Sequence, residues 1–176
     1  MVRYPVETAL AMTQKPITQL EAMYRAHGSS LLAYLSRRFG HCAAPEDLLH
    51  ETFVQALRRP YQVAAAPSPR AFLFGIARHL GLTALRRNQR LTIADSAADL
   101  ETPAPLPVPQ TDLADLRNAI ALLPPQLRDT LELRLRDELS YEEIGAVLEI
   151  PVGTVRSRLH HALRQLQEKL VQEDPS

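Results

Sequence analysis

Apolar residues recur along the chain at steps of three and four, the spacing of a buried helix face. Leu31, Leu35 and Phe39 follow one another at four-residue steps, and Gly40 then ends that helix. Pro45 begins the next helix, because its fixed φ suits the first helical turn. The buried stripe of this second helix is predicted to contain Leu49, Phe53, Ala56 and Leu57.

The opposite stripe of the same helix is polar apart from one valine. It contains Asp47, His50, Glu51, Val54 and Arg58. On the pattern alone, the ordinary interpretation of such a stripe is a solvated face.

A proline-bracketed loop and a long helix come next. Pro60, Pro67 and Pro69 bracket the loop. The apolar face of the helix contains Leu73, Ile76, Ala77, Leu80 and Ala84. A step of about 100° per residue places a polar set roughly opposite, made of His79, Thr83, Arg86 and Arg90.

An arginine-rich helix end can simply solubilise the chain or can bind nucleic acid, so both interpretations stay open here. Aromatic residues nearby could stack on bases, namely Tyr61, Phe72 and Phe74, although Phe74 is better suited to the core.

A proline-rich segment, TPAPLPVPQT at residues 102–111, interrupts the helical pattern. Its four prolines remove backbone donors and fix φ, which favours an extended linker. The expected organisation is therefore an N-terminal extension (1–15), a helical domain (16–90), a linker (91–111), a second helical domain (112–172) and a tail (173–176).

The second domain carries a specific start signal. Ser140 followed by Glu143 forms a capping box for the helix YEEIGAVL, whose apolar face contains Ile144, Val147 and Leu148. A break at Glu149, Ile150 and Pro151 precedes a longer helix, VGTVRSRLHHALRQLQEKL. This helix is predicted to bury Val155, Leu159, Ala162, Leu163 and Leu166.

The other side of that last helix is polar and basic. It contains Thr154, Arg156, Ser157, Arg158, His160, His161 and Arg164. A capped helix, a three-residue turn and a longer basic helix are typical of a helix-turn-helix, whose second helix enters the major groove. An ordinary helical hairpin is the alternative.

Composition agrees with an all-α protein of two small helical domains. The 176 residues are 45% hydrophobic but only 5% aromatic, with no Trp, so the cores must be mostly aliphatic. This excludes collagen-like, membrane-spanning and wholly disordered chains. Cys42 stands alone and cannot form an internal disulfide, and the first fifteen residues lack a signal-peptide pattern, so the expected compartment is the cytoplasm.

Charge is distributed unevenly although 20 Lys and Arg balance 20 Asp and Glu. Residues 16–90 carry ten arginines against four acids, whereas residues 91–115 carry five acids and no base. Residues 151–170 have a net charge of +3. Two basic blocks separated by an acidic spacer are compatible with a nucleic-acid partner despite the zero sum.

Three segments together resemble a known family. They are PEDLLHETFVQALRR, PRAFLFGIARHLGLTALRR and LPPQLRDTLELRLRDELSYEEIGAVLEIPVGTVRSRLHHALRQL. Over about residues 18–172 the chain resembles the extracytoplasmic-function (ECF) sigma factors of bacterial RNA polymerase. The resemblance implies a region-two and a region-four helical domain joined by a flexible linker, and partners that include core RNA polymerase, with its β′ clamp helices and β subunit, and promoter DNA.

The resemblance also assigns roles to the polar faces. The stripe from Asp47 to Arg58 would dock on the β′ clamp helices. The loop and the long helix after it would open and read the minus ten element through Tyr61, Arg70, Phe72, Arg78, His79, Thr83, Arg86, Arg87 and Arg90. The helix at 151–166 would read the minus thirty-five element through the seven polar residues named above.

Several positions depart from the common family pattern. The family has Gln at His50, Trp at Phe72, Asn at His79 and Asp at Thr83, and it commonly has Gly at Glu149. Phe72 within PRAFLFGIAR resembles the iron-uptake (ferric-citrate type) branch, whose members are often controlled by a membrane-bound anti-sigma partner. An anti-sigma partner is therefore expected.

Two other function classes are alternatives. A ligand-sensing transcriptional regulator would use residues 16–90 as an effector-binding bundle, and binding of core polymerase would distinguish the two classes. A catalytic or metal site would have to use His41, Cys42, His50 and His79, which lack paired-ligand spacing. No cofactor, metal or enzymatic activity is expected.

Overall fold

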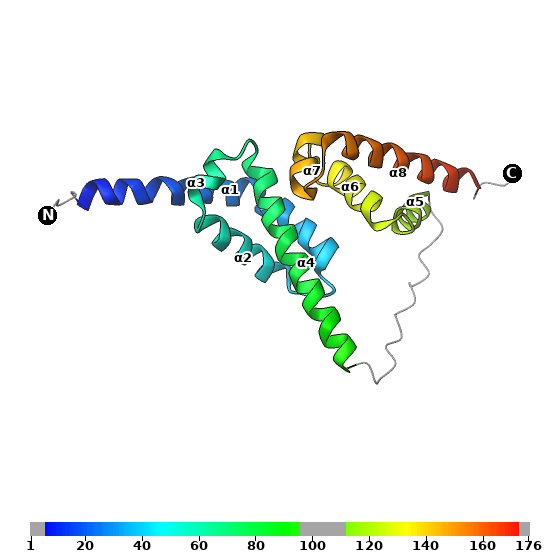
Figure 1. Cartoon of the computed structure of the whole chain (residues 1–176), viewed down its shortest axis with the longest axis horizontal. Helices are drawn as coiled ribbons and strands as arrows, with labels where there is room; N and C mark the ends of the chain where they lie inside the picture. The colour runs from blue at the N-terminus through cyan, green and yellow to red at the C-terminus, as the bar shows by residue number, and fades with distance from the viewer. Residues whose placement is uncertain (1–5, 96–111, 173–176) are drawn as a thin grey trace. The chain divides into compact units, whose positions relative to one another are not determined.

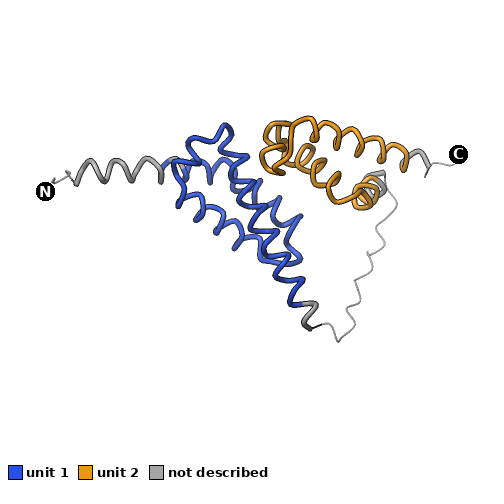
Figure 2. Tube along the Cα trace, viewed as in Figure 1, with its two compact units in different colours: residues 1–95 blue, residues 96–176 orange. Residues whose placement is uncertain are grey.

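The computed structural model describes the backbone of residues 6–95 and 112–172, and the side chains of residues 18, 20–91 and 116–169. Within these residues the secondary structure is helical, in agreement with the all-α prediction (Figure 1). The chain divides into two compact units, residues 1–95 and 96–176 (Figure 2). In the described residues no helix is long and apolar enough to cross a membrane.

The first unit contains α1 (Val6–Phe39), α2 (Pro45–Leu57), α3 (Pro60–Ala65) and α4 (Pro69–Asp95). Helices α1, α2 and α4 pack on one another. Helix α1 begins before the expected domain start, and α4 continues into the segment expected to be linker. The proline-rich stretch at residues 102–111 lies outside the described residues.

Local signals explain where these helices begin and end. Phe39 is the last residue of α1, and the Gly40 N–H donates to the Ser36 carbonyl at 3.2 Å. Pro45 occupies the first turn of α2, followed by Glu46 and Asp47 near the positive end of the helix dipole. These boundaries confirm the sequence prediction.

The core of the first unit is aliphatic and aromatic. Leu31, Leu35 and Phe39 of α1 are buried, as are Leu73, Phe74 and Ala77 of α4 and Leu49, Phe53 and Ala56 of α2. The Tyr34 and Phe74 rings lie 5.3 Å apart. A Cβ at Gly81 would overlap the Phe39 ring, so glycine allows α4 to lie close against α1 there.

Two details of the first unit correct the sequence prediction. Leu57 is 45% exposed, whereas the fully buried Thr52 takes a place in the α2 core. The Thr52 hydroxyl donates to the Leu48 carbonyl at 2.7 Å, so its burial leaves no polar group unsatisfied. The segment between Pro60 and Pro69, predicted as a loop, contains the short helix α3.

The second unit contains α5 (Asp112–Ala121), α6 (Pro125–Leu135), α7 (Tyr141–Leu148) and α8 (Val152–Gln172). Helix α8 packs against the other three. Its buried residues are Val155, Leu159, Ala162 and Leu166. Leu131 and Leu133 of α6 and Ile144 and Val147 of α7 are also buried in this unit. Leu163 was predicted to be buried but is 56% exposed, so that prediction was wrong.

The structure contains both the capping box and the tight turn predicted for the helix-turn-helix. The Ser140 hydroxyl accepts from the Glu143 N–H at 3.1 Å, and the Ser140 N–H donates to the Glu143 carboxylate at 2.8 Å. Glu149 then takes the left-handed conformation, with φ 57° and ψ 44°. The Ile150 N–H donates to the Gly145 carbonyl at 3.0 Å, which closes the turn before α8 begins.

Candidate polymerase and nucleic-acid interfaces

The polar stripe of α2 faces away from the core of the first unit. Asp47, His50 and Arg58 are exposed, while Glu51 and Val54 are half-buried. The Glu51 carboxylate accepts from the Gln55 side-chain amide at 3.1 Å, one turn along the helix. The stripe is therefore an accessible, mixed-charge face that a protein partner can reach.

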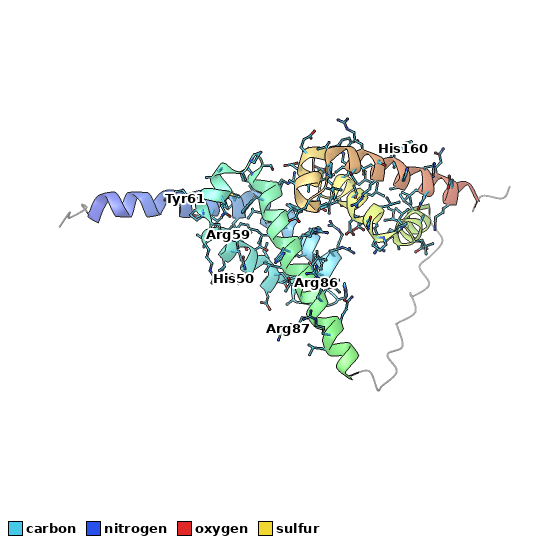
Figure 3. The ribbon with its side chains drawn as sticks, viewed as in Figure 1. His50, Arg59, Tyr61, Arg86, Arg87 and His160 are labelled. Carbon is cyan, nitrogen blue, oxygen red and sulfur yellow. The ribbon has the colours of Figure 1, made fainter. Side chains whose placement is uncertain are left out.

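The turn that contains α3 presents an aromatic ring to solvent. Tyr61 is 83% exposed, although its neighbour Val63 is buried and anchors the turn. Arg59 precedes α3, and its carbonyl accepts from the Gln62 and Val63 N–H groups at 3.0 and 3.1 Å. Figure 3 shows Arg59 and Tyr61 in this part of the first unit. An exposed ring two residues from an exposed arginine is suited to stacking on a nucleic-acid base.

The N-terminal half of α4 places its predicted minus-ten residues in mixed environments. Phe72, Arg70 and Arg78 are half-buried, while Phe74 is fully buried, which confirms its core role. The Arg70 guanidinium lies 5.7 Å from the centre of the Phe74 ring. Arg70 is thus oriented by the core on which it rests.

The C-terminal half of α4 exposes the basic stripe. His79, Thr83, Arg86, Arg87 and Arg90 are all exposed, and Figure 3 shows Arg86 and Arg87 projecting from this helix. The Thr83 hydroxyl donates to the His79 carbonyl at 2.9 Å, so it already has a partner within the helix. Three arginines in five residues give this end of α4 a strongly positive surface.

Helix α8 presents its polar residues on the side away from the second core. Arg156, Ser157, His160, His161 and Arg164 are exposed, and Thr154 and Arg158 are half-buried. The two histidine rings lie 6.1 Å apart, and Figure 3 labels His160 on the outer side of the helix. The capped helix α7, the tight turn and the exposed basic face of α8 form a recognition-helix arrangement.

Tertiary contacts distinguish the three α8 arginines, which are alike in the sequence pattern. The Arg158 guanidinium donates to the Gln126 side chain of α6 at 3.1 Å, across 32 residues. Arg164 lies 3.5 Å from the Glu168 carboxylate. Sequence reasoning missed Gln126, because no local pattern indicates a contact between two separate helices. It also left Arg59 out of the candidate DNA-contact residues, although its place two residues before Tyr61 could have indicated it.

The thiol of Cys42, the single cysteine of the chain, lies in a partly buried environment. Partial burial raises the pKa of its thiol, and a backbone hydrogen bond at Cys42 partly opposes this. The thiol donates to the Phe39 carbonyl at 3.2 Å. No group of three or more potential metal ligands occurs in the described part of the chain.

Comparison with known proteins decides the family. Residues 23–91 match the family model "Sigma-70 region 2", and residues 113–166 match "Sigma-70, region 4". The chain is 32% identical to RNA polymerase sigma factor HrpL of Pseudomonas syringae pv. syringae, covering 80% of each protein. It is 30% identical to RNA polymerase sigma factor YlaC of Bacillus subtilis, covering 86% of this chain and 91% of YlaC. This chain belongs to the sigma-70 family of RNA polymerase sigma factors. It is of the ECF type, because it is 30% identical to ECF RNA polymerase sigma factor SigL of Mycobacterium tuberculosis, covering 84% of this chain and 86% of SigL.

Other relatives bear on the type and the fold. ECF sigma factor SigE of Mycolicibacterium smegmatis is 32% identical over 89% of this chain, which spans 63% of the SigE length. Among solved structures, the sigma factor RpoE of Bartonella quintana, in complex with anti-sigma factor NepR, has a TM-score of 0.60 and 24% identity, covering 84% of this chain and 96% of that one. CnrH, in complex with the cytosolic domain of CnrY, has a TM-score of 0.58 at 24% identity, covering 89% of each chain. These two structures support the fold.

Proposed function

We propose that this ECF sigma factor binds core RNA polymerase and directs it to a specific set of promoters. The observation that carries the proposal is the joint presence of a region-two unit and a region-four unit in one chain, each with an exposed polar face. A ligand-sensing regulator needs only the second unit for DNA binding, so it leaves the region-two match unexplained. The protein acts as an initiation factor without a catalytic centre of its own.

Core polymerase docks on the exposed face of α2. Asp47 and Glu51 supply negative charge, Arg58 supplies positive charge, and Val54 supplies an apolar contact between them. His50 completes this face, which meets the β′ clamp helices. The β subunit is the second polymerase contact, and the cytoplasm is the compartment because core polymerase works there.

The minus ten element is read by the α3 turn and by α4. Tyr61 captures an unstacked base, since stacking on an aromatic ring is worth about 1–3 kcal/mol per base. The guanidinium groups of Arg86, Arg87 and Arg90 neutralise phosphates. Arg70, Phe72, Arg78, His79 and Thr83 complete the proposed surface.

The minus thirty-five element is read by α8 in the major groove. Arg156 contacts base edges or phosphates, and Thr154, Ser157 and the histidines add polar contacts. Arg158 and Arg164 complete the set. The two domains are assigned to residues 16–90 and 112–172, tethered by the acidic, proline-rich segment between them.

An anti-sigma factor is the proposed regulator. The sigma factor RpoE was solved in complex with the anti-sigma factor NepR, and CnrH was solved in complex with the cytosolic domain of CnrY. We assign the chain to the iron-uptake branch on the strength of Phe72 within PRAFLFGIAR, and its anti-sigma partner is then a membrane protein.

Binding of purified core polymerase tests the proposal against the regulator alternative. The full chain, labelled at Cys42, should bind core polymerase with a dissociation constant in the nanomolar range, measured by fluorescence anisotropy. A chain that binds DNA but not core polymerase would be a free-standing regulator, and the proposal would be wrong.

A further inference from the structure

Neither the packing nor the backbone conformation of α4 requires a glycine at position 75. It lies inside the 27-residue helix α4, where glycine is less favourable than alanine. No described glycine has positive φ, so the backbone at Gly75 is open to any residue. A Cβ added there would find nothing within 4 Å.

Other glycines of the chain differ in this respect. At Gly81, in the same helix, a Cβ would overlap the Phe39 ring, and at Gly145 it would lie 2.9 Å from the Ile150 carbonyl oxygen. Those two positions exclude a side chain because the fold is tight. Gly153 is also open, but it lies in the first turn of α8, where a glycine costs less than in a helix interior.

Gly75 lies on the face that the proposed function assigns to promoter DNA. At about 100° per residue, Phe72, His79 and Arg86 fall within about 60° of Gly75 around the α4 axis. Phe72 precedes it by three residues and His79 follows it by four, so their attachment points are separated by about 10 Å along the helix. The bare backbone at Gly75 therefore lies between the attachment points of Phe72 and His79 on one face of α4, with that of Arg86 further along the same face.

We infer that a nucleotide of promoter DNA lies directly against the α4 backbone at Gly75, between Phe72 and His79. The inference rests on the proposed function and adds a point of close approach to it. A gap of about 10 Å between these attachment points is long enough for one base or sugar, and the aromatic rings of Phe72 and His79 are chemically suited to stacking or edge contacts. Glycine is required because a methyl group would occupy the space of the nucleotide.

The test compares Gly75→Ala with Gly28→Ala in the full chain. Gly28 is a helix-interior glycine of α1 whose added Cβ would make ordinary contact with the Tyr24 ring at 3.7 Å. Both changes should raise the melting temperature of the first unit by about 2–8 °C, because alanine favours the helix. The probe is the strongest promoter fragment recovered when the wild-type holoenzyme transcribes sheared genomic DNA of the source organism.

Holoenzyme with Gly75→Ala should bind this fragment about tenfold more weakly, whereas Gly28→Ala should match the wild type. Affinity for core polymerase should be unchanged in both variants. Gly75→Leu keeps a good helix former and adds bulk, so it should bind the fragment more weakly still.

Promoter affinity of Gly75→Ala within twofold of wild type would overturn the inference, and so would an equal loss in Gly28→Ala. If wild-type holoenzyme initiates nowhere on genomic DNA, the proposed function fails and the inference fails with it. If wild-type holoenzyme initiates normally and Gly75→Leu binds normally, only the contact at Gly75 is wrong.

Discussion

Glu149 shows how one residue can carry strain at a functional turn. Its backbone is left-handed, with φ 57° and ψ 44°, a region that costs an L-residue roughly 1–2 kcal/mol. The conformation persists because the turn between α7 and α8 demands it, with Ile150 hydrogen-bonded back to Gly145 at 3.0 Å. The resemblance to ECF sigma factors placed Glu149 where the family commonly has Gly, and the left-handed backbone gives the physical reason for a glycine at this position.

Replacing Glu149 with Gly should stabilise the unit that contains α5 to α8. Relief of the strain is partly offset by the larger unfolded-state entropy of glycine, about 0.4–1 kcal/mol. The expected net gain is about 0.5–1 kcal/mol, or a rise of about 2–8 °C in melting temperature. Scanning calorimetry of the full chain measures it.

Glu149→Ala is the matched control, because it removes the charge but keeps the Cβ. It should leave the melting temperature within about 2 °C of wild type, since the strain remains. An equal rise in both variants would mean that charge, and not backbone strain, limits the stability of this turn.

Cys42 should react slowly with alkylating reagents at mildly alkaline pH. Partial burial raises the pKa of its thiol, so a smaller fraction is thiolate in the folded chain than in the unfolded chain at the same pH. The pH midpoint of iodoacetamide labelling should therefore lie higher for folded than for urea-unfolded protein. A lower midpoint in the folded chain would contradict the environment described for Cys42.

At the scale of a helix, α2 should bind core polymerase through charge. Asp47→Lys should weaken binding by about tenfold, and adding Glu51→Lys should weaken it further, because both carboxylates lie on the exposed side. Anisotropy with labelled protein measures the affinity. Circular dichroism should show unchanged helical content.

Glu46→Lys provides the control for this helix. Glu46 is also exposed and in the first turn of α2, so reversing its charge should disturb the helix dipole to a similar extent. Its side chain lies about 100° from that of Asp47 around the helix axis. Equal losses for Glu46→Lys and Asp47→Lys would indicate a general charge effect. Full affinity in the Asp47 and Glu51 double variant would rule out the α2 face as the docking surface.

Helix α8 should bind minus thirty-five DNA through its arginines. Replacing Arg156, Arg158 and Arg164 with Ala should flatten the salt dependence by about 0.9 in log–log slope for each arginine that neutralises a phosphate. Removal of an arginine that reads a base edge should relax sequence preference instead. Arg156 should have the largest effect, since Arg158 and Arg164 are partly engaged by Gln126 and Glu168.

Lys169→Ala removes one positive charge near the far end of the same helix. It should change promoter affinity much less than Arg156→Ala in holoenzyme binding assays at several salt concentrations. Unaltered affinity and slope in the triple arginine variant would show that this face of α8 does not contact DNA.

Helical periodicity predicted most elements, and the two leucines that it wrongly assigned to the core share a cause. Leu57 and Leu163 lie about 70–90° from the centres of their buried stripes, so hydrophobicity alone assigned them to the core. Thr52 was missed for the opposite reason, because its hydroxyl bonds within its own helix and is compatible with burial. The α3 helix was missed because three prolines favour a loop.

At the scale of the whole molecule, the sequence predicted the exposed faces but not their connections. Polar stripes on α2, α4 and α8 follow from periodicity, and the structure exposes or half-exposes every residue predicted for them. The Arg158 contact with Gln126, the placement of Arg70 on Phe74 and the open space at Gly75 depend on tertiary packing. No local pattern in the chain indicates them.

Charge is also organised at the scale of the molecule. The net charge of zero is the sum of a basic first unit, a basic final helix and acidic segments between them. Each basic region coincides with a face proposed to contact DNA. Electrostatic attraction to promoter DNA should therefore persist at neutral pH despite the isoelectric point of about 7.0.

The most direct measurement is in vitro transcription by purified core polymerase on genomic DNA, with and without this protein, followed by mapping of transcript starts. We expect discrete new start sites that depend on the protein and share two upstream sequence elements near minus ten and minus thirty-five. Addition of the protein without any new start site, while the same core polymerase responds to another sigma factor, would contradict the proposed function.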